Sequence, residues 1–105
     1  LIVGVAYKPG VSDVRESPAY DVIGLLNERG AEISYHDPYV PNFEVEGDTY
    51  ESVDLNRKML SEQDCVLIVT DHDVLDLNSI VDHAPLVFDT RNATDPSDGS
   101  HVHHL

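Results

Sequence analysis

The sequence predicts an open α/β sheet, mainly parallel, with helices on both of its faces. Short apolar runs alternate with segments of helical periodicity along the 105 residues. The run at residues 64–70 is rich in Val and Ile and apolar at consecutive positions, which is typical of a parallel strand covered on both faces. A strand, a helix and a second strand fit within residues 1–36. This βαβ unit implies a right-handed crossover between two parallel strands.

The first strand and the helix after it have clear boundaries. Leu1–Ala6 is uncharged, too short for a buried helix and bounded by turn formers, so we expect a strand there. The hydroxyl of Ser17 is expected to cap the next helix, and Pro18 suits the first helical position because no amide hydrogen is needed there. Gly30 supplies the left-handed residue that ends the helix. The apolar face expected of this helix consists of Val22, Ile23, Leu25 and Leu26.

The rest of the chain continues the alternation. The elements expected in order are a strand at 31–35, an extended piece at 43–45, a helix at 55–61 capped by Asp54, a strand at 64–70, a helix at 75–82 and a strand at 86–88. Cys65 falls in the strand expected at 64–70, where a lone thiol usually acts as a small apolar side chain. From Asp95 the chain is rich in Pro, Asp, Gly, Ser and His, which predicts a flexible tail over residues 95–105. Residues 1–94 then form one domain.

The composition excludes several classes of function. The net charge is −14, from 20 acidic and 6 basic residues, and such a field repels nucleic acid and anionic membrane surfaces. No stretch has transmembrane length and no signal peptide is visible, so we expect a cytoplasmic protein. A single cysteine excludes an internal disulfide and a thiolate metal cluster. Because the chain begins inside a strand without Met, we expect a fragment of a longer protein.

Three loops are expected to meet at one edge of the sheet. Ligands of open α/β sheets bind outside the carboxyl ends of the strands, and residues 7–8, 70–72 and 89–91 follow three of those ends. If the first strand is central, this edge holds Lys8, Arg15 and Arg91, which are half of all the cations. The loop that carries Lys8 and Arg15 also enters a helix N-terminus, where phosphate is the natural ligand. The pattern favours an anion site.

Each candidate residue also has a structural interpretation. Lys8 and Arg15 suit a diphosphate, and Arg91 suits a phosphate or a sugar hydroxyl. Tyr7 could place its ring against a base or a sugar, but a tyrosine at a strand end is more often rim packing. The structural alternatives are local ion pairs of Arg15 with Asp13 or Glu16, and of Arg91 with Asp89. Asp13 and Glu16 are better explained as groups that orient Arg15 than as an acid–base pair.

Other chemistries find little support. His36-Asp37 and His72-Asp73 follow different strands without metal-ligand spacing, and the remaining histidine cluster at 101–104 lies in the expected tail, so no metal site is predicted. No serine lies on a nucleophile elbow. Gly4 and Gly10 are wrongly spaced for a GxGxxG turn, so the primary NAD-binding half of a dehydrogenase is not in this chain.

Five motifs, in order, carry a family resemblance. They are GVAYKP at 4–9, DVRESPA at 13–19, YHDP at 35–38, TDH at 70–72 and DTRN at 89–92. With these motifs the chain resembles the C-terminal UDP-binding domain of the UDP-glucose/GDP-mannose dehydrogenase family, a Rossmann-like domain. The sequences Ala-Tyr-Lys at 6–8 and Tyr-His-Asp-Pro at 35–38 are most similar to those of the branch that oxidises UDP-N-acetylhexosamines. UDP-glucose is the other candidate substrate.

The resemblance implies a three-part enzyme of polysaccharide biosynthesis. An N-terminal domain would hold NAD, a central helical domain would form a homo-oligomer, and this domain would close over the UDP-sugar. The enzyme would oxidise the C6 alcohol of the sugar to a carboxylate while reducing two NAD. By position, Tyr7, Lys8 and Arg91 match residues that contact the UDP-sugar, and Arg15 matches an arginine near the NAD pyrophosphate. The family's catalytic cysteine and lysine lie upstream, so no catalytic residue is expected here, and the fragment alone is expected to be inactive.

Two other functions remain open on the sequence. One is a stand-alone nucleotide-binding or regulatory α/β module without catalysis. The other is a purely structural interaction domain, which predicts that Lys8, Arg15 and Arg91 can all be replaced by Ala without effect on any ligand.

Overall fold

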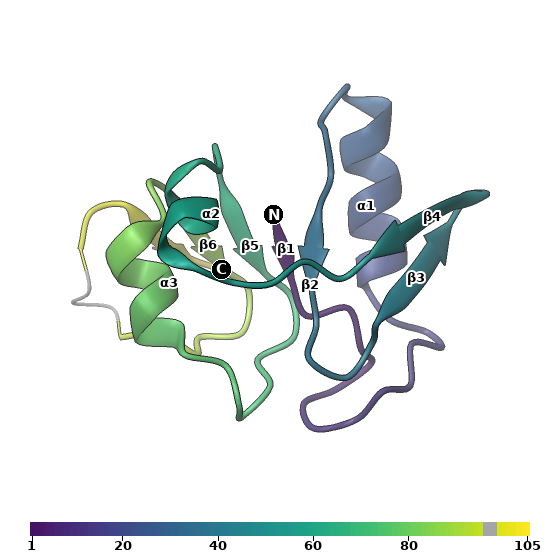
Figure 1. Ribbon diagram of the computed structural model, residues 1–105, viewed down its shortest axis with the longest axis horizontal. Coiled ribbons are helices and arrows are strands. Elements are labelled where there is room, and N and C mark those ends of the chain that lie inside the picture. The colour runs from purple at the N-terminus through teal and green to yellow at the C-terminus, as the bar shows by residue number, and fades with distance from the viewer. Residues whose placement is uncertain (96–98) are drawn as a thin grey trace.

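A computed structural model describes residues 1–95 and 99–105 and shows a parallel five-stranded sheet in the order β2-β1-β5-β6-β7 (Figure 1). Its strands are β1 (Ile2–Val3), β2 (Tyr35–His36), β5 (Val66–Ile68), β6 (Val87–Asp89) and β7 (Val102–His104). The helices are α1 (Ala19–Glu28), α2 (Arg57–Ser61) and α3 (Leu77–His83). The predicted mainly parallel α/β architecture is confirmed, and β1 lies between β2 and β5.

Two hydrophobic cores lie on opposite faces of the sheet. Successive side chains of a strand point to opposite faces, and Ile2 and Val3 of β1 accordingly belong to different cores. Ile2 packs in the cluster that contains Ile23 of α1, and Val3 packs in the cluster that contains Ile80 of α3. The helices therefore cover both faces, as predicted, with α1 on one and α2 and α3 on the other (Figure 1).

Helix α1 begins and ends as its sequence predicts, but its buried face differs from the prediction. Pro18 has helical dihedral angles (φ −62°, ψ −17°), and the hydroxyl of Ser17 accepts a hydrogen bond from the backbone N–H of Ala19 at 3.1 Å. Gly30 follows the helix at φ +82°. The prediction for Leu25 was wrong, because its side chain is 61% exposed. The predicted Ile23 is fully buried, together with Ala19 and Gly24, and the predicted Val22 and Leu26 are partly buried against the same core.

A β-hairpin lies between β2 and α2 along the chain. The extended piece expected at 43–45 is β3 (Asn42–Val45), which pairs antiparallel with β4 (Asp48–Glu51), a strand that the sequence analysis did not predict. Phe43 and Val45 point into the core beside α1. The following helix is shorter than predicted, and its cap is the side chain of Asn56 rather than Asp54, since Asn56 accepts from the N–H of Met59.

The C-terminal part departs most from expectation. Within the predicted tail at 95–105, β7 extends the sheet by parallel pairing with β6, and residues 96–98 lie outside the described residues. The prediction of frayed chain was wrong for β7. Cys65 precedes β5 instead of lying in it, and it is half-buried. Among the described residues, no helix is both long and apolar enough to cross a membrane.

Candidate functional site

The loops that follow β1 and β5 are in direct contact at the carboxyl edge of the sheet. Gly4 has φ +83°, and a Cβ added to it would overlap the carbonyl oxygen of Thr70 and lie 2.6 Å from the Cβ of Thr70. Thr70 also donates its hydroxyl to the carbonyl of Ala6 at 2.7 Å. Glycine is required at position 4 both for its left-handed backbone and for this close approach. The expectation that these loops share one edge is confirmed.

A buried carboxylate holds the start of the β1 loop. The Oδ2 atom of Asp37, which follows β2, accepts hydrogen bonds from the backbone N–H groups of Val5 at 2.8 Å and Ala6 at 3.1 Å. Its Oδ1 atom accepts from the N–H of Tyr39 at 2.8 Å. These bonds satisfy the backbone of β1 after sheet pairing ends, where an unpaired buried N–H would cost free energy.

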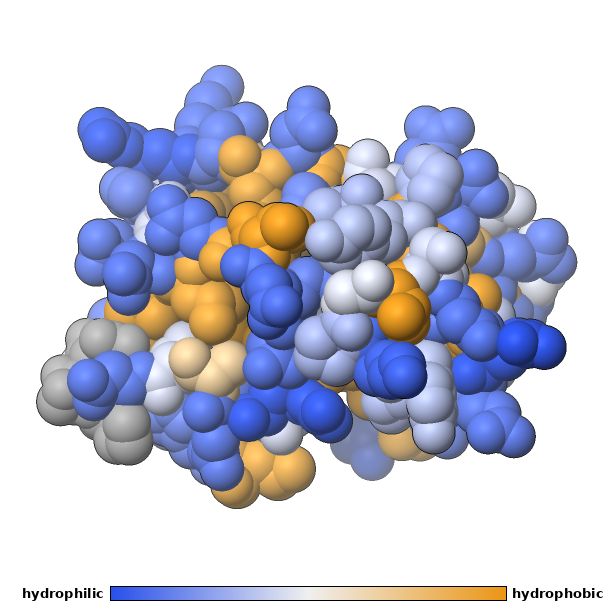
Figure 2. Space-filling view, turned by 90° about the horizontal axis from the view of Figure 1, so that it is seen from below, coloured by the Kyte–Doolittle hydropathy of each residue, from blue (hydrophilic) through white to orange (hydrophobic). Residues whose placement is uncertain are grey.

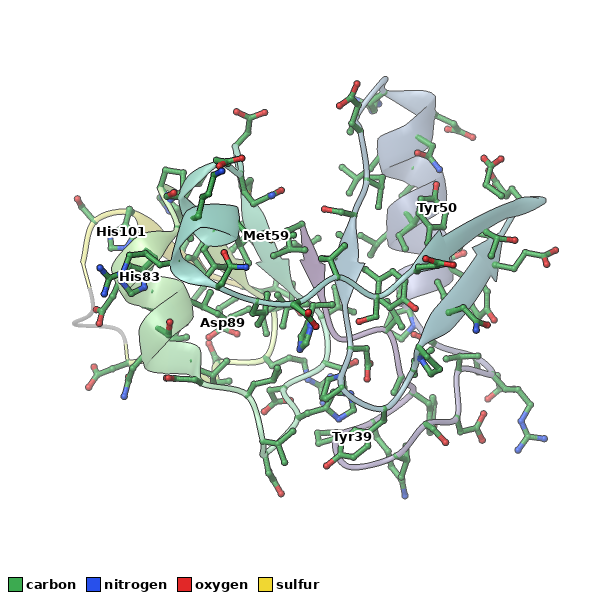
Figure 3. The ribbon with its side chains drawn as sticks, viewed as in Figure 1. Tyr39, Tyr50, Met59, His83, Asp89 and His101 are labelled. Atoms are coloured by element: carbon green, nitrogen blue, oxygen red, sulfur yellow. The ribbon has the colours of Figure 1, made fainter. Side chains whose placement is uncertain are left out.

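A buried histidine holds the other end of the same loop. His72, which follows β5, contacts Asp37 Oδ2 through Nε2 at 2.9 Å and accepts at Nδ1 from the N–H of Gly10 at 2.9 Å. The ring of Tyr39 covers His72 at 4.8 Å between centroids and 68° between planes, and Figure 3 places Tyr39 at this edge of the molecule. Neither Asp37 nor His72 was predicted as a site residue.

The predicted substrate residues Tyr7 and Lys8 lie between these two anchors. Both are exposed, Tyr7 with 52% of its surface accessible. The backbone N–H of Tyr7 donates to the carbonyl of Asp13 at 2.6 Å, which ties the loop to the segment that enters α1. The loop backbone is thus held in place, while the side chains of Tyr7 and Lys8 are exposed to solvent.

Arg91 follows β6 and reaches toward the β5 loop. Its Nε atom lies 3.4 Å from Oδ1 of Asp71, a buried oxygen that has no hydrogen-bond partner in the part of the chain that the structure describes. The ion pair of the Arg91 guanidinium with Asp89, considered as the structural alternative to a ligand contact, is not observed. Asp89 instead accepts a hydrogen bond from the Arg91 backbone N–H at 2.9 Å.

Asp89 organises the turn that presents Arg91. It is fully buried, and its Oδ2 atom accepts from the N–H of Thr94 at 2.8 Å and from the Thr94 hydroxyl at 2.7 Å. Burial by itself would raise the pKa of this carboxyl, but hydrogen bonds from Thr94, Arg91 and Ala93 outweigh it and lower the pKa. Asp89 is the last residue of β6, and it is labelled in Figure 3. The charged carboxylate therefore supports the fold of the 89–94 turn.

Arg15 stands apart from the other cations. Its guanidinium donates to both carboxylate oxygens of Asp13, at 3.1 and 2.9 Å, and its side chain is 87% exposed. These hydrogen bonds lower the pKa of Asp13 to about 2. The prediction that Asp13 orients Arg15 is confirmed, while Glu16 makes no such contact with it. No hydrogen bond or ion pair among the described residues joins the Arg15 loop to Arg91.

The surface at this edge is mainly hydrophilic. Figure 2 views the molecule from the side at which the strands end, and apolar patches interrupt a mostly polar surface.

A groove of about 770 Å³ lies at the opposite edge, beside the amino ends of the strands, and its lining includes Leu1, Leu26, Ile33, Cys65 and Leu67. Within the described residues, no group of three or more His, Cys, Asp or Glu side chains is placed to hold a metal ion.

Comparison with known proteins gives a family match across the domain. The model of the UDP-glucose/GDP-mannose dehydrogenase family, UDP binding domain, matches residues 1–96. The UDP-N-acetyl-D-mannosamine dehydrogenase of Methanococcus maripaludis is 36% identical over 104 residues, which cover 91% of this chain and 23% of that protein. The UDP-glucose 6-dehydrogenase of Bacillus subtilis is 33% identical over 72 residues, which cover 67% of this chain and 16% of that protein.

A solved structure shares the fold. The UDP-D-ManNAc dehydrogenase from Pyrococcus horikoshii superimposes with a TM-score of 0.73 at 26% identity, over 99% of this chain and 24% of that one. The chain therefore spans about a quarter or less of the length of the relatives that it matches.

Proposed function

Because this chain belongs to the UDP-glucose/GDP-mannose dehydrogenase family, whose UDP binding domain it matches, we propose that it binds the UDP-sugar substrate of an NAD-dependent 6-dehydrogenase. The observation that carries the proposal is the construction of the carboxyl edge. Hydrogen bonds and an ion pair tie the loops after β1, β5 and β6 together, through Thr70 to Ala6, His72 to Gly10 and Arg91 to Asp71. Exposed Tyr7 and Lys8 project from this framework.

The charges at this edge suit a diphosphate. The net charge of −14 repels anionic ligands from most of the surface. An anion can therefore bind only where cationic side chains are held close together. Lys8 would supply an ammonium donor to a phosphate oxygen, and Arg91 would supply planar donors to a phosphate or a sugar hydroxyl. The exposed ring of Tyr7 would pack against the base or the sugar. In this arrangement Asp71 holds Arg91 in place before the ligand arrives.

Backbone strain next to both arginines supports a ligand site. Three non-glycine residues of the described chain have a left-handed backbone: Glu16 (φ +60°) and Asn92 (φ +55°) directly follow Arg15 and Arg91, and Glu46 (φ +53°) lies in the β3–β4 turn. Side chains other than glycine adopt this left-handed conformation at a cost, and such residues concentrate at ligand-binding sites and switch regions.

NAD would be held mainly by parts of the enzyme outside this chain and would accept the hydrides removed from the sugar. The chain has no GxGxxG turn, and Arg15 is a single exposed guanidinium, which fits one contact to a pyrophosphate rather than a complete dinucleotide site. Asp13 fixes the direction of Arg15 through two hydrogen bonds. Arg15 would therefore add to a cofactor site that another domain builds.

We assign no catalytic residue to this chain. Burial raises the pKa of the Cys65 thiol, so the thiolate that a nucleophile requires is disfavoured. The oxidation of the C6 alcohol to a carboxylate would take place on the remaining domains, and these 105 residues alone should not reduce NAD in the presence of a UDP-sugar. The proposed setting is a cytoplasmic homo-oligomeric enzyme of polysaccharide biosynthesis.

The substrate is either a UDP-N-acetylhexosamine or UDP-glucose, and we favour the former. The relatives named above include dehydrogenases of both kinds, and the M. maripaludis UDP-N-acetyl-D-mannosamine enzyme is 36% identical over 104 residues, against 33% over 72 residues for the B. subtilis UDP-glucose enzyme. Both substrates share the UDP group, which is the part assigned to this domain.

Affinity measurements with UDP test the proposal. Isothermal titration calorimetry of Lys8→Ala and Arg91→Ala should each show UDP binding weakened about tenfold, the size expected for losing a hydrogen bond to a charged group. Arg57→Ala is the matched control, since Arg57 is an exposed cation on α2, away from the carboxyl ends of the strands. This variant should bind UDP like the wild type. Equal losses in all three variants would point to general electrostatics instead of a site.

A further inference from the structure

Two buried side chains anchor the β1 loop on either side of its exposed residues. The carboxylate of Asp37 holds the N–H groups of Val5 and Ala6, and the imidazole of His72 holds the N–H of Gly10. The side chains of Asp37 and His72 are both fully buried, and they contact each other at 2.9 Å. The two anchors are therefore one hydrogen-bonded unit that joins the loops after β2, β1 and β5.

The hydrogen bonds assign a single tautomer to His72. A backbone N–H only donates, so Nδ1 must be unprotonated to accept from Gly10. The proton of the neutral ring then sits on Nε2, which donates it to Asp37. The ring of Tyr39 packs on His72, and the Tyr39 N–H donates to the same carboxylate from the other side. The imidazole is thus fixed in both position and direction.

The imidazole of His72 holds the backbone of the loop at Gly10 through a hydrogen bond. Gly10 has φ +79°, and no atom lies within 4 Å of the place that a Cβ would occupy. The residue faces open space on that side, and its N–H is held by His72. The loop is also tied at Tyr7, whose N–H donates to the carbonyl of Asp13, and at Val11, which packs against the core. Release of the His72 bond would therefore loosen the segment around Gly10, which directly follows the segment of Tyr7 and Lys8.

We propose that His72 is a positioning residue for nucleotide binding: through the Gly10 amide it fixes the loop that presents Tyr7 and Lys8, without touching the nucleotide itself. This inference rests on the proposed UDP site. Asp37 sets the tautomer that His72 needs for this task and holds the start of the same loop. A loop fixed before binding loses less conformational freedom when the ligand arrives, so the His72 contact raises affinity for UDP.

Two substitutions separate the two ends of the imidazole. His72→Asn places an amide oxygen near the position of Nδ1 and keeps an acceptor for Gly10. His72→Gln places an amide nitrogen near Nε2 and keeps a donor for Asp37, but it leaves Gly10 without its acceptor. We expect His72→Asn to bind UDP within about threefold of the wild type and His72→Gln to bind about tenfold more weakly, the range of one lost hydrogen bond.

The Gly10 amide reports on the loop without any ligand. In hydrogen-exchange measurements by NMR, this amide should be protected in the wild type and in His72→Asn and should exchange fast in His72→Gln. A reversed order of the two variants, or UDP affinity equal to the wild type in both, would overturn the inference.

A measurement on the wild type alone covers the case in which a variant fails to fold. The ¹⁵N spectrum of His72 at neutral pH should show the neutral ring with its proton on Nε2, and a proton on Nδ1 would overturn the inference. If the wild-type chain does not bind UDP, the proposed function fails. If it binds UDP while the Gly10 amide is unprotected, only the role of His72 fails.

Discussion

Replacement of Gly4 by Ala should destabilise the protein through the contact between β1 and β5. The added Cβ would overlap the carbonyl oxygen of Thr70 and lie 2.6 Å from its Cβ, and the backbone at position 4 has φ +83°. Relief of the overlap requires the ends of two hydrogen-bonded strands to separate, because the atoms met first belong to the backbone. The same change would disturb the place where the loops of the proposed site meet.

The magnitude follows from two costs. A residue with a Cβ in the left-handed region costs about 1–2 kcal/mol. Overpacking at a tightly packed position adds about 1–3 kcal/mol. Gly4→Ala should therefore lower the free energy of unfolding by about 2–5 kcal/mol in total, a large fraction of the stability of a small domain.

Gly30→Ala is the matched control. Gly30 has φ +82°, nearly the same backbone conformation, but no atom lies within 4 Å of the added Cβ. The free energy of unfolding of Gly30→Ala should therefore fall only by the conformational cost of about 1–2 kcal/mol. Both changes are Gly→Ala, so their effects on the unfolded chain are similar and largely cancel in the comparison.

Urea denaturation followed by circular dichroism measures both variants. We expect the midpoint of Gly4→Ala to fall well below that of Gly30→Ala, with similar m-values in both, and a difference of at least about 1 kcal/mol. Equal free energies of unfolding for the two variants would refute the close approach of Gly4 to Thr70.

Three further changes test the fold and the turn that carries Arg91. Asp89→Asn should cost about 1–3 kcal/mol at neutral pH. The pKa of Asp89 is lowered in the folded state, so its charge stabilises the fold above the ordinary carboxyl pKa of about 4, and this contribution is lost as the pH falls through the folded-state value. Acid titration of stability should accordingly be flatter in Asp89→Asn than in Asp21→Asn, an exposed control on α1. Ile23→Ala should destabilise by about 2–4 kcal/mol in urea denaturation, whereas Leu25→Ala should stay within about 0.5 kcal/mol. Similar losses in the two variants would mean that Leu25 belongs to the buried face, as first predicted. Deletion of residues 101–105 removes β7 and should cost more than about 2 kcal/mol, whereas an unchanged thermal midpoint would mean that these residues are a frayed end after all.

Local signals predicted the first half of the domain well. The hydroxyl of Ser17, the ring of Pro18 and the freedom of Gly30 act through residues one or two positions away, and all three behave as the sequence indicates. The exposure of Leu25 was missed because helical periodicity alone does not say how wide the covered stripe is. The β3–β4 hairpin covers the side that holds Gly24, where Oε1 of Glu46, in the turn between the two strands, lies 3.2 Å from an added Cβ, and it leaves Leu25 outside.

Long-range pairing explains the larger misses. The strand β7 was missed because its histidines and the preceding Gly and Ser read as a tail, whereas parallel pairing with β6 and the contact of His104 with Thr94 hold it in the sheet. Asp37 and His72 are 35 residues apart in sequence, and no spacing rule connects them. The signal available was their placement shortly after the carboxyl ends of two strands that flank β1, which puts both beside the loop that carries Tyr7.

The candidate site was predicted in part. Two predictions are confirmed, namely that the three loops share one edge and that Asp13 orients Arg15. The ion pair of Arg91 with Asp89, considered as the structural alternative to a ligand contact, is not observed, and the guanidinium lies beside Asp71 on the neighbouring loop. Pairing across loops depends on the sheet order, which the sequence does not specify. The roles of Tyr7, Lys8, Arg15 and Arg91 toward ligands remain predictions.

An amide-resolved NMR titration with UDP tests the central claim most directly, since it detects even millimolar binding, worth about 4 kcal/mol. We predict saturable shifts confined to residues 4–10, 70–72 and 89–92, and weaker binding in Arg91→Ala. Shifts that cluster instead at residues 30–34 and 62–65, beside the groove at the amino ends of the strands, would contradict the account. So would the absence of any shift at millimolar UDP.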